Sequence, residues 1–85
     1  MIIDPSQDDI DKAFEGTNFG PCGKTPEGRK NLVVHCILKL TCEFADGYTI
    51  RQICKELGLL TKNGKPKKSA KRWAYRCIAE QLRNN

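Results

Sequence analysis

The sequence predicts an all-α fold, a small four-helix domain of helix-turn-helix-like or winged type with a short β-hairpin near Asn63-Gly64. Three observations support this prediction. Apolar residues recur at steps of three and four in four segments, residue types that favour helix starts precede these segments, and the Asn-Gly pair is typical of a tight turn. We expect helices near residues 5–15, 26–45, 49–57 and 69–83.

Length and charge describe one domain, residues 1–85, with an acidic helix and loop over 1–24 and a helical core with a basic C-terminal half over 25–85. Residues 1–47 contain five Lys or Arg against eight Asp or Glu (net −3), whereas residues 48–85 contain ten against two (net +8). A basic half suits phosphate contacts with nucleic acid, and a basic surface without a partner is the alternative. A core of this size is too thin to shape a deep, dry active site easily, so we do not expect an enzyme.

The first helix is expected to begin at Asp4-Pro5-Ser6, where two side chains can cap and proline suits the first turn. Its apolar strip is narrow and consists of Ile10, Ala13 and Phe14. Its acidic residues are expected on the solvated face, where they are favoured near the positive N-terminal end of the helix dipole. Gly16–Lys24 is predicted to be a loop. Gly20–Thr25 contains glycines and a Lys-Thr pair, but its spacing is not that of a phosphate-binding loop, so nucleotide hydrolysis is not expected.

The second predicted helix is the longest and forms the backbone of the core. Thr25-Pro26-Glu27 supplies a cap, a proline for the first position and an acid for the first turn. Apolar residues then stay on one side for about five turns. These residues are Leu32, Val33, Cys36, Ile37, Leu40 and Phe44. Asp46-Gly47 is expected to end this helix.

The third helix is predicted from a capping box formed by Thr49 and Gln52. Its apolar stripe consists of Ile50, Ile53, Cys54 and Leu57. Gly58 favours the left-handed conformation that ends a helix. This order is typical of the first helix and turn of a helix-turn-helix motif, although Leu59–Pro66 is longer than the turn of the tight form.

The last third of the chain is predicted to form the functional surface. Asn63-Gly64 indicates a type I′ turn, and Pro66 confines its arm to an edge, so a two-stranded wing or a bare turn should project lysines. Ser69 is expected to cap a final helix. The buried stripe of this helix is predicted as Ala70, Trp73, Ala74, Cys77, Ile78 and Leu82. The candidate nucleic-acid-binding residues are Lys62, Lys65, Lys67, Lys68, Lys71, Arg72, Tyr75 and Arg76.

Cysteine and histidine usage predicts no catalytic residue, no metal site and no cofactor. The five cysteines include no C-x-x-C pair. Cys36, Cys54 and Cys77 lie on apolar stripes and are expected to be buried small hydrophobes, while His35 stands alone at the surface. The start of the chain, Met1-Ile2-Ile3-Asp4, has no positive region or long apolar run. We therefore expect no export, no membrane insertion and reduced thiols in a cytoplasm.

Four stretches of the chain resemble a group of small accessory proteins encoded by lambdoid phages and prophages of enteric bacteria. They are Thr25-Pro26-Glu27-Gly28-Arg29, Thr49-Ile50 with Ile53-Cys54, Leu57–Pro66 and Lys71-Arg72-Trp73-Ala74. The resemblance covers roughly Thr17 to Ile78. It implies a bacterial host cytoplasm and an accessory phage role, and it identifies no functional residue.

Two functions are compatible with these features. The first is DNA binding as an accessory or regulatory protein, in which lysines neutralise phosphates of duplex DNA and the last helix reaches a groove. The alternative is a phage protein that binds and inhibits or redirects an acidic host protein, with Trp73 or Tyr75 as an exposed anchor. Burial of Trp73 would assign it to the core. A homodimer suits the two-fold symmetry of many DNA sites, but no sequence feature marks an interface.

Overall fold

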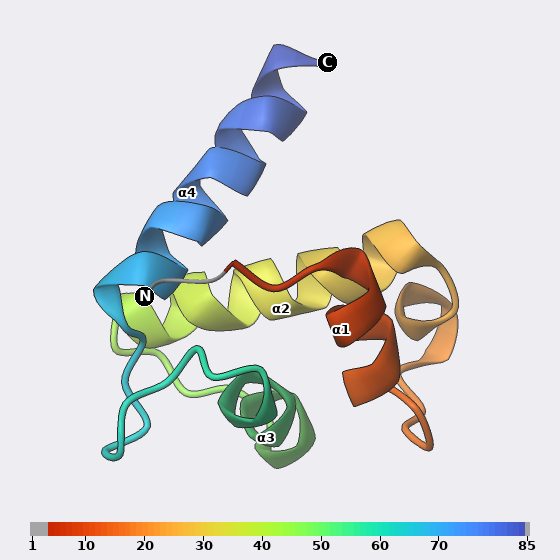
Figure 1. Ribbon diagram of the computed structural model, residues 1–85, viewed down its shortest axis with the longest axis horizontal. Helices are drawn as coiled ribbons and strands as arrows, with labels where there is room; N and C mark the ends of the chain where they lie inside the picture. The colour runs from red at the N-terminus through yellow and green to blue at the C-terminus, as the bar shows by residue number, and fades with distance from the viewer. Residues whose placement is uncertain (1–3, 85) are drawn as a thin grey trace.

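The computed structural model describes residues 4–84, and this part of the chain folds as an all-α domain (Figure 1). Its helices are α1 (Gln7–Ala13), α2 (Pro26–Thr41), α3 (Tyr48–Glu56) and α4 (Lys68–Arg83), with a 3-10 turn, η1 (Gly20–Gly23), in the predicted loop. The all-α class is confirmed. Residues 1–3, which include most of the Met1-Ile2-Ile3-Asp4 start, lie outside the described residues.

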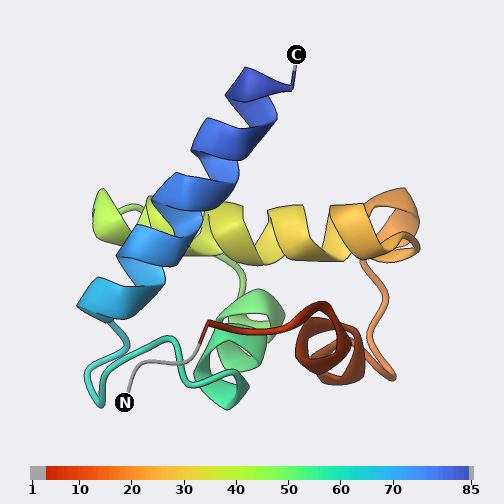
Figure 2. The same cartoon turned by 45° about the horizontal axis from the view of Figure 1, so that its top comes forward.

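Helix α2 is the centre of the core, because α1, η1, α3 and α4 all pack against it. In both views α4 crosses one side of α2, while α3 and α1 lie on another (Figure 1; Figure 2). Val33, Val34, Cys36 and Ile37 are therefore fully buried. Val34 lies outside the predicted stripe, and it is buried because α2 has neighbours on more than one side.

The caps of the first two helices are as predicted, but α1 begins at Gln7, so Pro5 precedes the helix and does not lie in its first turn. The hydroxyl of Ser6 accepts the amide of Asp9 (3.1 Å), and the Asp9 carboxylate accepts the amide of Ser6 in return. The hydroxyl of Thr25 accepts the amide of Gly28 (3.0 Å). A Cβ at Gly28 would lie 2.1 Å from the carbonyl oxygen of Cys22, so the close approach of η1 to α2 requires glycine here.

Helix α2 ends earlier than predicted, at Thr41 rather than near residue 45. Glu43 adopts a positive φ of 65°, and the amide of Phe44 donates to the carbonyl of Lys39 (2.8 Å), which closes the helix. The sequence pointed to Asp46-Gly47 because glycine is the usual residue in this conformation. Phe44 consequently leaves the predicted stripe and is 68% exposed.

The predicted caps of the last two helices are wrong. Helix α3 begins at Tyr48 after Gly47, so Thr49 lies inside the helix and forms no capping box. Helix α4 begins at Lys68, one residue before the expected cap, Ser69. The reason is that the amide of Lys67 donates to the carbonyl of Leu59 (3.0 Å), which fixes the direction of the chain before Ser69.

The predicted β-hairpin is absent from residues 4–84, where the only β pairing is a single antiparallel bridge between Leu60 and Pro66. The amide of Gly64 donates to the carbonyl of Thr61 (2.9 Å), which closes a tight turn. Gly64 has a φ of 78°, whereas Asn63 is not among the residues with positive φ, so the turn is not type I′. Leu60 and Pro66 are buried in the core, and this burial holds the loop without strands.

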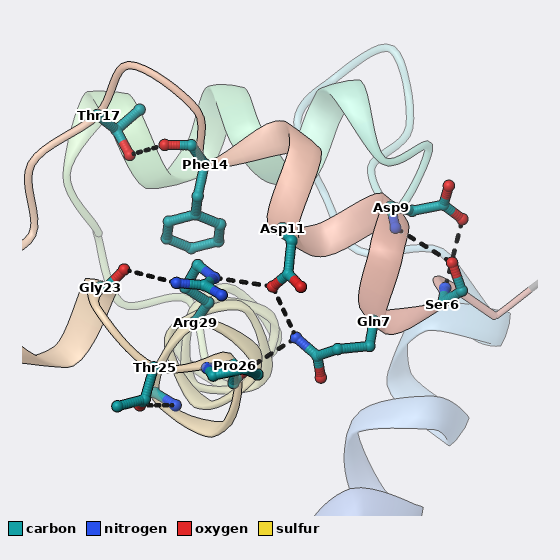
Figure 3. A network of polar contacts seen from close by, with 11 residues as sticks. Ser6, Gln7, Asp9, Asp11, Phe14, Thr17, Gly23, Thr25, Pro26 and Arg29 are labelled. Atoms are coloured by element: carbon teal, nitrogen blue, oxygen red, sulfur yellow. Dashed lines mark hydrogen bonds and ion pairs between the residues drawn. The ribbon is translucent and has the colours of Figure 1, made fainter.

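A polar network ties α1 to α2 (Figure 3). The guanidinium of Arg29 donates from Nε to the carboxylate of Asp11 (2.7 Å) and from Nη1 to the carbonyl of Gly23 (3.0 Å). The amide of Gln7 donates to the same Asp11 oxygen (3.0 Å) and lies 3.1 Å from the carbonyl of Pro26. The Arg29 and Gln7 hydrogen bonds hold the pKa of Asp11 below its usual range.

This network predicts a specific pH dependence of stability. Because the pKa of Asp11 is lowered on folding, its carboxylate stabilises the fold above the usual aspartate pKa of about 3.9, and this stabilisation is lost as the pH falls through the lowered value. We expect Asp11→Asn to lower the free energy of unfolding at neutral pH and to make its decline below about pH 4 shallower. Urea unfolding at several pH values measures both effects, with Glu15→Gln as the control. Equal pH profiles for Asp11→Asn and the unmodified protein would contradict the role of the network.

Candidate nucleic-acid interface

The candidate site is built on the connecting loop, residues 58–67, between α3 and α4. Gly58 has a φ of 74°. The amide of Gly58 donates to the carbonyl of Lys55 (3.0 Å) and that of Leu59 to the carbonyl of Cys54 (3.0 Å), so α3 ends in a Schellman motif. Leu59 then enters the core at 3% exposure. The Schellman motif thus fixes the start of the loop, and the hydrogen bond from the amide of Lys67 to the carbonyl of Leu59 fixes its end.

The lysines of the connecting loop face solvent. Lys62, Lys65 and Lys67 are all exposed, while Leu60 and Pro66 between them are buried. The amide of Thr61 donates to the carbonyl of Lys65 (2.7 Å), so the tip is closed by hydrogen bonds within the chain. In both views the loop lies at the end of the molecule where α4 begins, away from α1 (Figure 1; Figure 2).

The cations of α4 lie on the face opposite its buried stripe. Ala70, Trp73, Ala74 and Cys77 are buried. Lys68, Arg72 and Arg76 follow at steps of four, so their side chains form one exposed row. Lys71 and Tyr75 form the neighbouring row; Lys71 is partly buried and Tyr75 is 53% exposed.

Two hollows flank the connecting loop. One, of about 170 Å³, lies between the loop and α3 and includes Arg51, Lys55 and Lys62. The other, of about 520 Å³, lies between the loop and the end of α2 and includes Lys65, Lys71 and Glu43. The structure therefore brings Lys62 near two cations of α3 and Lys65 near Lys71.

Ion pairing separates the predicted site residues into two groups. Within residues 4–84, ion pairs join Arg29 to Asp11, Lys39 to Asp46 and Arg76 to Asp4. Arg76 is thus the one predicted cation with a carboxylate partner in this part of the chain. The other six make no ion pair there, and they are Lys62, Lys65, Lys67, Lys68, Lys71 and Arg72.

The predicted site omitted Arg51 and Lys55 of α3. Both side chains are exposed and border the same hollow as Lys62. The sequence contained the relevant signal, because Arg51 and Lys55 are one helical turn apart and opposite the apolar stripe. Their proximity to Lys62 depends on how the connecting loop folds back beside α3, which the spacing does not specify.

The aromatic and apolar residues of the last third are mostly in the core. Trp73 is 6% exposed and belongs to the same buried cluster as Ile37 and Leu59. It is therefore a core residue. Leu82, predicted to be buried, is 71% exposed, because the last turns of α4 extend past α2 (Figure 1; Figure 2).

Among residues 4–84, no group of three or more histidine, cysteine or acidic side chains could hold a metal ion, and all five cysteines are free. Cys36, Cys54 and Cys77 are buried as predicted. Hydrogen bonding to the Cys36 thiol and burial raise the pKa of Cys54, and burial raises the pKa of Cys77. The raised pKa values keep the thiols of Cys54 and Cys77 in the protonated, unreactive form. His35 is exposed, as expected.

Comparisons with models of protein families, with curated proteins and with solved structures gave no match. No helix within residues 4–84 has the length and apolar character needed to span a bilayer.

The thiol environments predict which cysteines react. We expect a thiol reagent such as DTNB to modify Cys22 and Cys42 rapidly, because both are exposed, and the three buried cysteines only after denaturation. Absorbance at neutral pH, followed by mass spectrometry of the modified peptides, measures the result. Rapid modification of Cys36, Cys54 or Cys77 in the folded protein would contradict the assigned burial.

Proposed function

We propose that this protein binds duplex DNA as a small accessory or regulatory protein, in the setting of a phage or prophage in a bacterial cytoplasm. The observation that supports the proposal is a group of six cations on the connecting loop and α4 that form no ion pair within residues 4–84, and all of them except Lys71 are exposed. No Asp or Glu occurs between Glu56 and Glu80. A surface of this kind attracts a polyanion, since each neutralised phosphate releases counterions.

The mechanism assigns different tasks to the two elements. Lys62, Lys65 and Lys67 on the fixed loop neutralise backbone phosphates, which positions the protein on the duplex. In this mechanism the exposed row of α4 lies along a groove, and Arg72 of that row and Tyr75 of the neighbouring row reach base edges. The proposed mechanism uses α3, the connecting loop and α4 in the order of a helix-turn-helix motif, while both helices pack against α2.

Binding to an acidic host protein is the second candidate. It is favoured by two exposed side chains of α4: Tyr75, in the middle of the helix, is 53% exposed, and Leu82, near its free end, is 71% exposed. Burial of Trp73, Leu59 and Leu60 removes the apolar patch that this alternative would use beside the loop. The basic surface thus supports a polyanion better than it supports a protein partner.

The proposal predicts duplex binding that depends on where charge is removed. We expect the unmodified protein to bind a random-sequence duplex in the micromolar range at low salt, measured by fluorescence anisotropy. Lys62→Gln/Lys65→Gln should weaken binding by about five- to tenfold for each phosphate that is no longer neutralised, at ~0.1 M salt. The matched control is Lys12→Gln/Lys24→Gln, which removes the same charge from exposed positions at the other end of the molecule.

Two results would count against the proposal. Absence of binding by the unmodified protein at low salt would overturn it. Equal weakening by the loop variant and by the matched control would mean that net charge alone, rather than the loop and α4, determines the affinity.

The Asp4–Arg76 ion pair predicts a small gain of affinity when it is removed. Asp4 occupies Arg76, a member of the exposed row of α4, so Asp4→Asn should release this cation for phosphate contact. We expect a tighter complex by no more than about fivefold, because an exposed pair contributes about 0–1 kcal/mol. Asp8→Asn, on the exposed side of α1, is the control of equal charge. A gain no larger than that of this control would exclude a role for the pair.

A further inference from the structure

The hollow between α3 and the connecting loop differs in composition from four other hollows on the surface of residues 4–84, each of which is bordered by at least one acidic residue. Arg51, Lys55 and Lys62 border it, together with the neutral polar side chains of Gln52, Thr61 and Asn63, and no acidic residue does. The nearest acid along the chain, Glu56, borders a different hollow on the α1 side of α3. Charge of one sign is thus concentrated around a single concave site.

We propose that this hollow is a phosphate-binding site that holds one backbone phosphodiester of a nucleic acid on the α3 side of the connecting loop. The inference rests on the proposed function and extends it to residues that the sequence did not assign. It gives α3 a direct part in binding, in addition to its place in the core.

The chemistry of the bordering residues fits a phosphodiester. The guanidinium of Arg51 offers a planar fork of donors that matches two phosphate oxygens, and Lys55, one helical turn later, adds a second positive charge. Lys62 approaches from the loop, so the three cations come from two elements. The hydroxyl oxygen of Thr61 accepts a hydrogen bond from the amide of Lys65 (3.3 Å). Its hydroxyl proton therefore remains free to donate to a phosphate oxygen.

Contacts within the protein fix the backbone on both sides of this hollow. On the loop side, the Thr61 amide and hydroxyl hold the turn against Lys65. On the helix side, Ile50, Ile53 and Cys54 fix α3 in the core. A site on fixed elements loses less conformational entropy on binding than one on mobile side chains and backbone.

The hollow on the other side of the loop carries less charge. Lys65 and Lys71 border it, but so does Glu43. A phosphodiester is therefore favoured in the hollow on the α3 side. With one phosphate of a duplex in this hollow, the next phosphates of the strand would lie near Lys65 and the start of α4.

The test is the salt dependence of duplex binding by Arg51→Gln/Lys55→Gln. Association constants from fluorescence anisotropy are measured over a range of KCl concentrations, and the slope of log K against log salt counts neutralised phosphates at about 0.9 each. We expect the slope to decrease in magnitude by about 0.9, as it should when one phosphate is no longer neutralised. Arg51→Lys/Lys55→Arg keeps both charges and should keep the slope, while Lys12→Gln/Lys24→Gln controls for net charge. Both altered α3 side chains are exposed, and circular dichroism verifies that each variant is folded.

The outcomes separate this inference from the proposed function. Duplex binding by the unmodified protein with an unchanged slope in Arg51→Gln/Lys55→Gln would overturn the α3 site and leave the role of the loop and α4 intact. A slope reduced equally by the Lys12→Gln/Lys24→Gln control would also overturn it. Absence of duplex binding by the unmodified protein would overturn the proposed function and this site together.

Discussion

Helix α2 is buried on more than one side, and the positions of all the other helices follow from their packing against it. Val33, Val34, Cys36 and Ile37 are completely covered, and every extensive contact between elements involves α2. In a chain of this size such a shared partner provides most of the apolar burial that opposes chain entropy. It also fixes α3 and α4 relative to one another, because both helices pack against α2.

The placement of charge follows from this packing. The connecting loop is anchored through the burial of Leu59, Leu60 and Pro66, so its lysines project from a fixed backbone. The first turns of α4 lie beside it, and α1 lies at the other end of the molecule (Figure 1; Figure 2). The exposed lysines of the loop and the cations at the start of α4 produce a field that attracts polyanions. Salt screens this field over about 10 Å at 0.1 M.

The sequence predicted the all-α class and the buried stripes of α3 and the first half of α4, because helical periodicity reports directly on burial. It failed where tertiary contacts overrule local signals. The residue with positive φ after α2 is Glu43 and not a glycine. Before α4, the amide of Lys67 donates to the carbonyl of Leu59, and no side chain caps the helix. The Asn63-Gly64 pair marked a turn correctly but not its type. For the candidate site, helical spacing identified exposed cations. Spacing could not predict that Arg51 and Lys55 lie near Lys62, or that Arg76 pairs with Asp4, because these contacts join residues that are far apart in the sequence.

NMR mapping of a bound duplex is the decisive measurement of where this protein contacts DNA, since it reports on backbone amides without altering any side chain. On titration of the ¹⁵N-labelled protein with a short DNA duplex, we expect chemical-shift changes that concentrate in the connecting loop, the first half of α4 and the exposed face of α3. The amides of α1 should change little. Changes confined to the free end of α4 around Leu82, or spread evenly over the molecule, would contradict binding through the connecting loop, α3 and the start of α4.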